Sequence, residues 1–261
     1  MPADAEQAND SPTEETGVPG WYRAALGAPV ASGEATVAAA RIVFHAWGPE
    51  GGPGLVLLHG GGAHAHWWDH VGPLLAGSRR VVALDLSGHG DSDRRSSYSL
   101  DHWAEEALAV ARAAGLAPHP VIVGHSMGGF VSLRAGALFG PQLTGVVAID
   151  SPMHRRTPEE MAAIQRRAFG PLKTYATFEQ AMRRFRPVPD EGFTLPYVKD
   201  HVARTSIRRT ESGWSWKFDP KIFARDRSTP VADRVLDCRV ALFRAEHGLL
   251  SAADSDVVYD R

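Results

Sequence analysis

Val121-Ile122-Val123-Gly124-His125-Ser126-Met127-Gly128-Gly129 joins an apolar, strand-like run to a helical pattern through the motif G-x-S-x-G. A strand, a tight turn and a helix are the context in which this motif presents a serine nucleophile at the top of a sheet. Glycines two residues before and after the serine are needed because side chains there would clash. The turn lifts Ser126 Oγ towards a helix N-terminus, which favours developing negative charge. We therefore predict that Ser126 is a catalytic nucleophile.

Two further motifs precede this one. The loop Leu57-Leu58-His59-Gly60-Gly61-Gly62-Ala63-His64 follows an apolar run directly. Its small residues let backbone N–H groups approach a reacting carbonyl, so we predict an oxyanion hole made by the N–H groups of Gly61 and Met127. The second motif, Asp85-Leu86-Ser87-Gly88-His89-Gly90-Asp91-Ser92, follows another apolar run. We expect His89 to brace that loop.

Strand and helix patterns alternate around these motifs. Short, fully apolar runs are typical of strands that are buried on both faces. Strand, helix and strand in repetition indicate βαβ units, so the sequence predicts an α/β fold with a mostly parallel sheet and helices on both faces. The expected strands are Gly33–Ala39, Arg41–Trp47, Gly54–Leu58, Val81–Leu84, Val121–Val123, Leu143–Ile149 and Arg239–Arg244, and the expected helices include Trp67–Ala76, Leu100–Ala114 and Met127–Leu138.

In this order and spacing, the three motifs resemble those of the α/β-hydrolase superfamily over roughly residues 34–261. The chain looks most like the soluble bacterial branch of serine esterases, thioesterases and C–C hydrolases, whose members carry a helical lid after the sixth strand. The resemblance implies a Ser–acid–His triad in that chain order and no cofactor. It also implies a small-molecule substrate, an ester, thioester or related carbonyl, that reacts through an acyl-enzyme.

The triad acid has two candidates. In most relatives the acid follows the seventh strand, but Gly248 occupies that position here and the nearby Glu246 is out of register. Some relatives place the acid at the end of the sixth strand, where this chain has Asp150. Active sites of open α/β sheets lie at such carboxyl ends of strands. We favour Asp150 and keep Glu246 as the alternative; the purely structural interpretation of Asp150 is a turn former before Ser151.

Composition divides the chain into three parts. Residues 1–20 are polar and are expected to form a disordered tail. Residues 21–151 and 226–261 form the hydrolase core. Residues 152–225 are rich in charge, proline and aromatic residues and are too long for a loop, so we expect a helical lid. Trp214 and Trp216 in this lid, and His125 beside the nucleophile, are candidates for substrate contact, although all three would also serve as packing residues.

The sequence offers no match for the family's catalytic histidine. Residues 245–261 suffice for a turn and a short helix, Ser251–Arg261, but not for an eighth strand and the loop that carries the base. Of the later histidines, His154 and His201 fall in or next to the lid, and only His247 could substitute. We therefore expect a C-terminally truncated, nearly inactive hydrolase whose strand near residues 240–243 becomes an exposed sheet edge. A catalytically impaired fragment or a non-catalytic binder is the alternative function.

Charge and composition bound the remaining possibilities. The chain has 28 basic and 30 acidic residues and a net charge of −2, which indicates neither a nucleic-acid partner nor a membrane-surface helix. The acidic N-terminus lacks the apolar run of a signal peptide, so we expect a cytoplasmic protein. The single cysteine, Cys238, cannot form an internal disulfide. His64, His66 and His70 do not share one helix face, so we expect no metal site there. The oligomeric state is left open.

Overall fold

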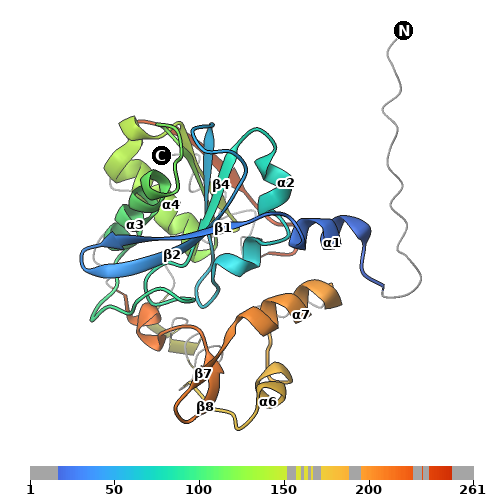
Figure 1. Cartoon of the computed structure of the whole chain (residues 1–261). Helices are drawn as coiled ribbons and strands as arrows, with labels where there is room; N and C mark the ends of the chain where they lie inside the picture. Colours follow the sequence, from blue (N-terminus) through green and yellow to red (C-terminus); the bar gives the residue numbers. More distant parts are fainter. Residues whose placement is uncertain are drawn as a thin grey trace.

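A seven-stranded sheet forms the centre of the computed structural model, which describes residues 17–151, 157–159, 162–163, 166, 172–187, 195–225, 231 and 235–248 (Figure 1). The strand order is β1-β2-β4-β3-β5-β6-β9. From β4 to β9 all neighbours pair in parallel, whereas β1 with β2 and β2 with β4 pair antiparallel. The predicted α/β fold with a mostly parallel sheet is confirmed. The strands are β1 (Ala31–Val37), β2 (Ala40–Trp47), β3 (Gly54–Leu58), β4 (Arg80–Leu84), β5 (Val121–His125), β6 (Gly145–Ile149) and β9 (Arg239–Phe243).

The central strands are apolar because both sheet faces are covered. Val56 and Leu58 of β3 face a hydrophobic cluster that includes α3 (Leu100–Ala113) and α4 (Met127–Phe139), whereas Leu57 faces a second cluster that includes residues of α2 (Gly72–Ala76). Successive side chains of a strand point to opposite faces, so a strand between two layers needs an apolar residue at every position. The runs that predicted these strands are thus the middle layer of three.

The helices on the sheet agree with the sequence in one case and differ in another. Ser99 caps α3 as expected, because its side chain accepts a hydrogen bond from the His102 N–H at 3.2 Å. The single helix expected over residues 67–76 is wrong. Instead, a short 3₁₀ helix, η1 (Ala65–Trp68), ends at Trp68, and a separate helix, α2, starts at Gly72. Pro73 has no N–H and is favoured in the first turn, so the helix begins anew instead of continuing.

The insertion after β6 lies beside the sheet as a separate group of elements (Figure 1). It was expected to be helical, but it also holds an antiparallel hairpin, β7 (Ile207–Thr210) with β8 (Gly213–Trp216). Gly213 permits this hairpin because its φ of 131° is open to glycine and strained for other residues. The other described elements of the insertion are α6 (Phe178–Met182), α7 (Pro196–Thr205) and η3 (Pro220–Ala224). That this group acts as a lid stays a prediction.

Polar contacts attach α7 to the segment around η1. Asp69 Oδ2 lies 2.8 Å from His66 Nδ1 and 2.8 Å from His201 Nε2 of α7. Burial acts to raise the pKa of Asp69, but the hydrogen bonds with His201 and His66 outweigh it and hold the pKa at about 2. A second contact joins His64 Nε2 to Ser206 Oγ at 2.8 Å. The insertion is therefore fixed to the core through ionised and buried groups.

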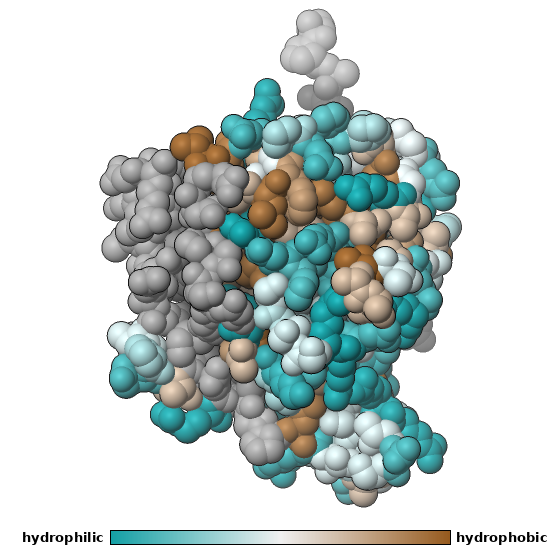
Figure 2. Space-filling view, turned by 90° about the vertical axis from the view of Figure 1, so that its left-hand side faces the viewer, coloured by the Kyte–Doolittle hydropathy of each residue, from teal (hydrophilic) through white to brown (hydrophobic). Residues whose placement is uncertain are grey.

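One edge of the central sheet exposes apolar side chains. On the face seen in Figure 2, hydrophobic side chains form small separate groups among hydrophilic ones. Within the described part of the chain, β9 pairs only with β6, and its Val240 and Phe243 are 44% and 58% exposed, as an edge strand predicts. No helix in the described ranges has both the length and the apolar character needed to cross a bilayer.

Candidate active site

Ser126 stands in a strained turn between β5 and α4. Its φ of 52° and ψ of −113° are rare for a residue with a side chain. A methyl group on Gly124 would come 2.0 Å from the carbonyl oxygen of Gly128, and one on Gly128 would come 2.5 Å from that of Leu58. Both flanking glycines are thus required by close backbone approach, as the motif predicts.

The end of β6 holds this turn in place. The Ser126 N–H donates to the carbonyl of Ile149 at 2.8 Å and extends the parallel pairing of β5 with β6. The carbonyl of Ser126 accepts from Ser151 Oγ at 2.8 Å and from the Gly129 N–H at 3.0 Å. These bonds offset the backbone strain at Ser126 and leave its side chain free of the helix cap. No local pattern in the sequence indicates the part played by Ser151.

The glycine loop after β3 lies directly against the nucleophile turn. A methyl group on Gly60 would come 3.3 Å from His125 Nδ1 and 3.5 Å from Ser126 Cβ. A methyl group on Gly61 would come 3.6 Å from Met127 Sδ. The structure therefore brings together Gly61 and Met127, the two residues predicted to donate to an oxyanion, and places the half-buried His125 beside the same loop.

His59 braces this loop from beneath. Its Nε2 accepts the N–H of Leu86 at 3.1 Å, so the ring proton is on Nδ1, which donates to the carbonyl of Gly60 at 2.8 Å. Complete burial lowers the pKa of His59 to about 4, so the ring is neutral near pH 7 and keeps this tautomer. A histidine directly before the glycines was the available signal for this brace.

The two candidate acids differ in their surroundings. Asp150 is 5% exposed, has a φ of 46°, and its N–H donates to the carbonyl of Phe243 at 2.7 Å. A methyl group on Gly248 would come 2.3 Å from the Asp150 carboxylate. The carboxylate therefore fills the space that a side chain at position 248 would need. Glu246 is exposed in the turn after β9. Which of the two serves as acid stays a prediction.

The histidines after Ser126 have different positions. His201 is bonded to Asp69 on the η1 side of the insertion. His247 lies exposed in the turn after β9, next to Gly248 and hence near Asp150. His154 lies outside the described residues. Of the described histidines after Ser126, His247 is therefore the one at the strand ends where Asp150 lies.

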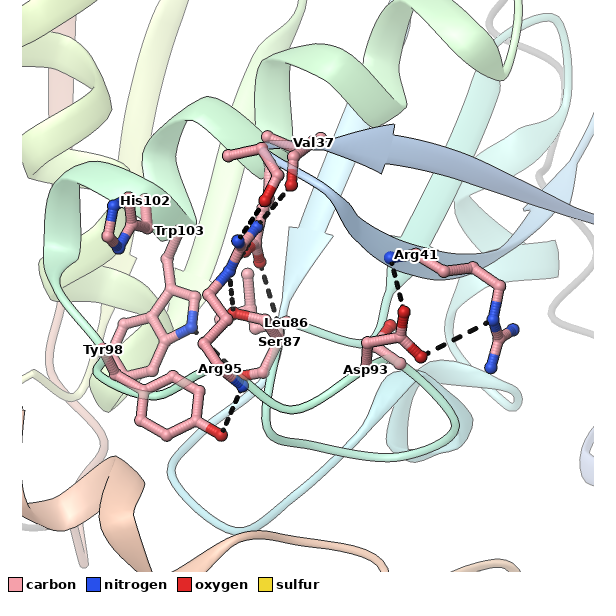
Figure 3. A network of polar contacts seen from close by, with 12 residues as sticks. Val37, Arg41, Leu86, Ser87, Asp93, Arg95, Tyr98, His102 and Trp103 are labelled. Atoms are coloured by element: carbon pink, nitrogen blue, oxygen red, sulfur yellow. Dashed lines mark hydrogen bonds and ion pairs between the residues drawn. The ribbon is translucent and has the colours of Figure 1, made fainter.

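The loop after β4 is held by a buried polar network (Figure 3). Arg95 forms an ion pair with the fully buried Glu106 at 2.9 Å and donates to Ser87 Oγ at 3.1 Å and to the carbonyl of Val37 at 2.7 Å. Glu106 also accepts the Ser87 N–H at 2.9 Å. Burial raises the pKa of Glu106, while the Ser87 bonds and Arg95 oppose that shift. This network ties the loop to α3 and to the β1–β2 turn.

Asp85 fixes the start of the same loop. Its carboxylate accepts the N–H groups of Ala65 and Asp91, each at 2.7 Å, and so connects the loops after β3 and β4. Burial raises the pKa of Asp85 to about 6, against the lowering effect of these two bonds. His89 lies buried within this loop, with Nδ1 3.3 Å from the carbonyl of Leu86, which fits the bracing part expected of it.

The tryptophans proposed to contact substrate pack within the insertion. The ring of Trp214 lies 5.2 Å from that of Phe178, and the ring of Trp216 lies 5.8 Å from that of Tyr175. Their part in substrate binding stays a prediction. Phe223 of η3 was not among the predicted site residues, although its ring edge would come within 3.2 Å of a methyl group on Gly61. No local pattern signals this contact, because it joins residues far apart in the chain.

Comparison with known proteins identifies the family of this chain. Residues 55–258 match the model of the Alpha/beta hydrolase family. The chain is 31% identical over 180 residues to an esterase of Mycobacterium tuberculosis, covering 66% of this chain and 58% of that one. It is 41% identical over 105 residues to the dihydrolipoyllysine-residue acetyltransferase component of the acetoin cleaving system of Pseudomonas putida, covering 40% of this chain and 28% of that one.

The matched stretch thus spans 28% of the acetyltransferase component and 58% of the esterase, less than two thirds of the length of either relative. Among solved structures, E-2-(acetamidomethylene)succinate hydrolase superposes with a TM-score of 0.77 at 20% identity over 89% of this chain and 87% of that one, a likeness in fold. The family match covers most of the chain, and the motifs and the strained serine turn fall within it. The chain belongs to the Alpha/beta hydrolase family.

Proposed function

We propose that this chain is a serine hydrolase that cleaves a small ester, thioester or related carbonyl through an acyl-enzyme. The observation that supports it most is the conformation of Ser126, with φ 52° and ψ −113° at the N-terminus of α4. Backbone strain of this kind persists where surrounding contacts enforce it and is concentrated at functional sites. The bonds from Ser151, Gly129 and β6 supply that enforcement here.

In the proposed reaction Ser126 Oγ attacks the carbonyl carbon while a histidine takes its proton. The N–H groups of Gly61 and Met127 hold the oxyanion. The close approach of these two residues supports this assignment. Asp150 is the proposed acid that orients the histidine, and its burial next to Gly248 favours it over the exposed Glu246. The tetrahedral intermediate then collapses, the bond to the alcohol or thiol breaks, and the histidine gives its proton to this leaving group. Water hydrolyses the resulting acyl-enzyme, which releases the acid and restores Ser126, and the sequence requires no cofactor.

The test is hydrolysis of p-nitrophenyl acetate by the chain and by Ser126→Ala. The alanine variant should lose hydrolysis while its circular dichroism spectrum is unchanged. Retention of most of the activity by Ser126→Ala would show that the nucleophile is another group. His247→Ala tests the base within the chain: a loss as large as that of Ser126→Ala assigns the base to His247. A folded chain that neither hydrolyses esters nor reacts with serine probes would be the non-catalytic binder.

A further inference from the structure

Phe223 lies where the proposed oxyanion loop meets the residue after the nucleophile. A methyl group on Gly61 would come 3.2 Å from Phe223 Cε1, 3.6 Å from Met127 Sδ and 3.9 Å from Met127 Cβ. The aromatic ring therefore lies beside Gly61, one of the two predicted oxyanion donors, and Gly61 in turn lies beside Met127, the other. Phe223 is half-buried, and Phe218 packs edge-on to it with ring centroids 6.1 Å apart. The side chains of Met127 and Phe218 near this ring are both apolar.

The helix that carries Phe223, η3, is fixed at its N-terminal end and through a buried residue. Asp219 caps η3 by accepting the Lys221 N–H at 3.0 Å, and its other carboxylate oxygen accepts from Tyr98 at 2.9 Å. The Asp219 N–H donates to the carbonyl of Gly88 at 2.7 Å, so the entry to η3 is bonded to the loop after β4. Ile222, next to Phe223, is 1% exposed in the main core. The ring is thus held over the loop by the fold.

The sheet order assigns this ring to one side of the nucleophile. The glycine loop follows β3 and Asp150 follows β6, and these strands flank β5 on opposite sides. A leaving group must lie near the histidine that protonates it, and the acid that orients this histidine belongs to the β6 side. The other substituent of the carbonyl carbon, the acyl group, is then directed towards the β3 side and Phe223.

We propose that Phe223 is a specificity-determining residue that forms the wall of the acyl site and restricts it to short acyl groups. The inference rests on the proposed function of Ser126. It predicts that a smaller side chain at position 223 admits longer acyl chains and that a larger one excludes them. Each methylene that becomes buried should favour binding about fourfold. Truncation of the ring should therefore raise the preference for long over short acyl groups by at least about tenfold.

The first experiment measures kcat/KM for p-nitrophenyl esters from acetate to octanoate. Phe223→Ala should raise the octanoate-to-acetate ratio by about tenfold or more, and Phe223→Trp should lower it. Phe139→Ala is the matched control, because Phe139 is a partly buried phenylalanine at the end of α4 that is remote from Ser126, and its ratio should stay within about twofold of the parent. An unchanged ratio in Phe223→Ala and Phe223→Trp, with Ser126→Ala inactive, would overturn the acyl-wall inference alone.

The second experiment needs no turnover and so separates this inference from the proposed function. Binding of methyl n-alkyl ketones, which are uncleavable isosteres of esters, is measured by calorimetry from butanone to decan-2-one. The affinity for decan-2-one should rise about tenfold in Phe223→Ala and fall in Phe223→Trp, whereas butanone should change by less than about twofold. If Phe223→Ala does not fold, Phe223→Trp decides the matter. Equal affinities for decan-2-one in the parent and Phe223→Trp would refute the wall, whatever the outcome at Ser126.

Discussion

Exchanging the residues at positions 150 and 248 moves the proposed acid from the end of β6 to the turn after β9. A methyl group on Gly248 would come 2.3–2.4 Å from the Asp150 carboxylate, and contacts of a methyl group below 3.0 Å essentially never occur. Gly248→Ala or Gly248→Asp alone must therefore push that carboxylate away by about 1 Å, and a misplacement of this size costs on the order of 10²-fold in rate. Asp150→Asn should cost on the order of 10⁴ in kcat.

The double variant Asp150→Gly, Gly248→Asp should recover part of this loss. Glycine suits position 150, where φ is 46°, and removal of the Asp150 side chain vacates the space that the new aspartate needs. The assay is kcat for p-nitrophenyl acetate, with thermal unfolding as the control for folding. Glu246→Gln should have a far smaller effect than Asp150→Asn. The reasoning is refuted if the double variant is no better than Asp150→Gly, or if Glu246→Gln costs more than Asp150→Asn.

Two further predictions concern the loop after β4. Burial raises the pKa of Asp85 from 3.8 to about 6, so the folded state binds this proton more tightly and the free energy of unfolding should fall by about 2 kcal/mol as pH rises from 4 to 6. Urea unfolding of the parent and Asp85→Asn should show that this slope is lost in the variant, and an equal slope in both would contradict the assignment. Glu106→Ala should lower the free energy of unfolding by about 3–5 kcal/mol, because it leaves the largely buried Arg95 without its ion pair. Glu106→Gln keeps the shape of the side chain and should lower it less. Equal losses in urea unfolding of the two variants would contradict this explanation.

Local patterns predicted the elements whose surroundings are regular. The apolar run Gly54–Leu58 is β3 residue for residue, because a strand buried on both faces leaves its composition in the sequence. The Ser99 cap and the glycines around Ser126 were predicted for the same reason, since each reports a constraint within a few residues. The prediction of one helix over residues 67–76 was wrong, because it followed the apolar periodicity and gave too little weight to Pro73, a local signal for the start of a new helix.

Contacts between distant segments could not be predicted in this way. The Asp150 carboxylate occupies the space that a side chain at position 248 would need. The sequence shows an aspartate at position 150 and a glycine at position 248, but not that the two positions share this space. Phe223 reaches Gly61 across the fold, and nothing in the run around η3 indicates it. The β7–β8 hairpin was hidden because its strands are four residues each, too short for a clear alternation.

The most direct test of the central claim is the site at which the chain reacts with a fluorophosphonate probe. The strained turn, the adjacent glycine loop and the helix N-terminus together should make Ser126 an activated nucleophile. Peptide mass spectrometry after labelling should therefore find the probe on the peptide that contains Ser126, and Ser126→Ala should remain unlabelled under the same conditions. Labelling of another serine, or equal labelling of the parent and Ser126→Ala, would contradict the assignment of Ser126 as nucleophile.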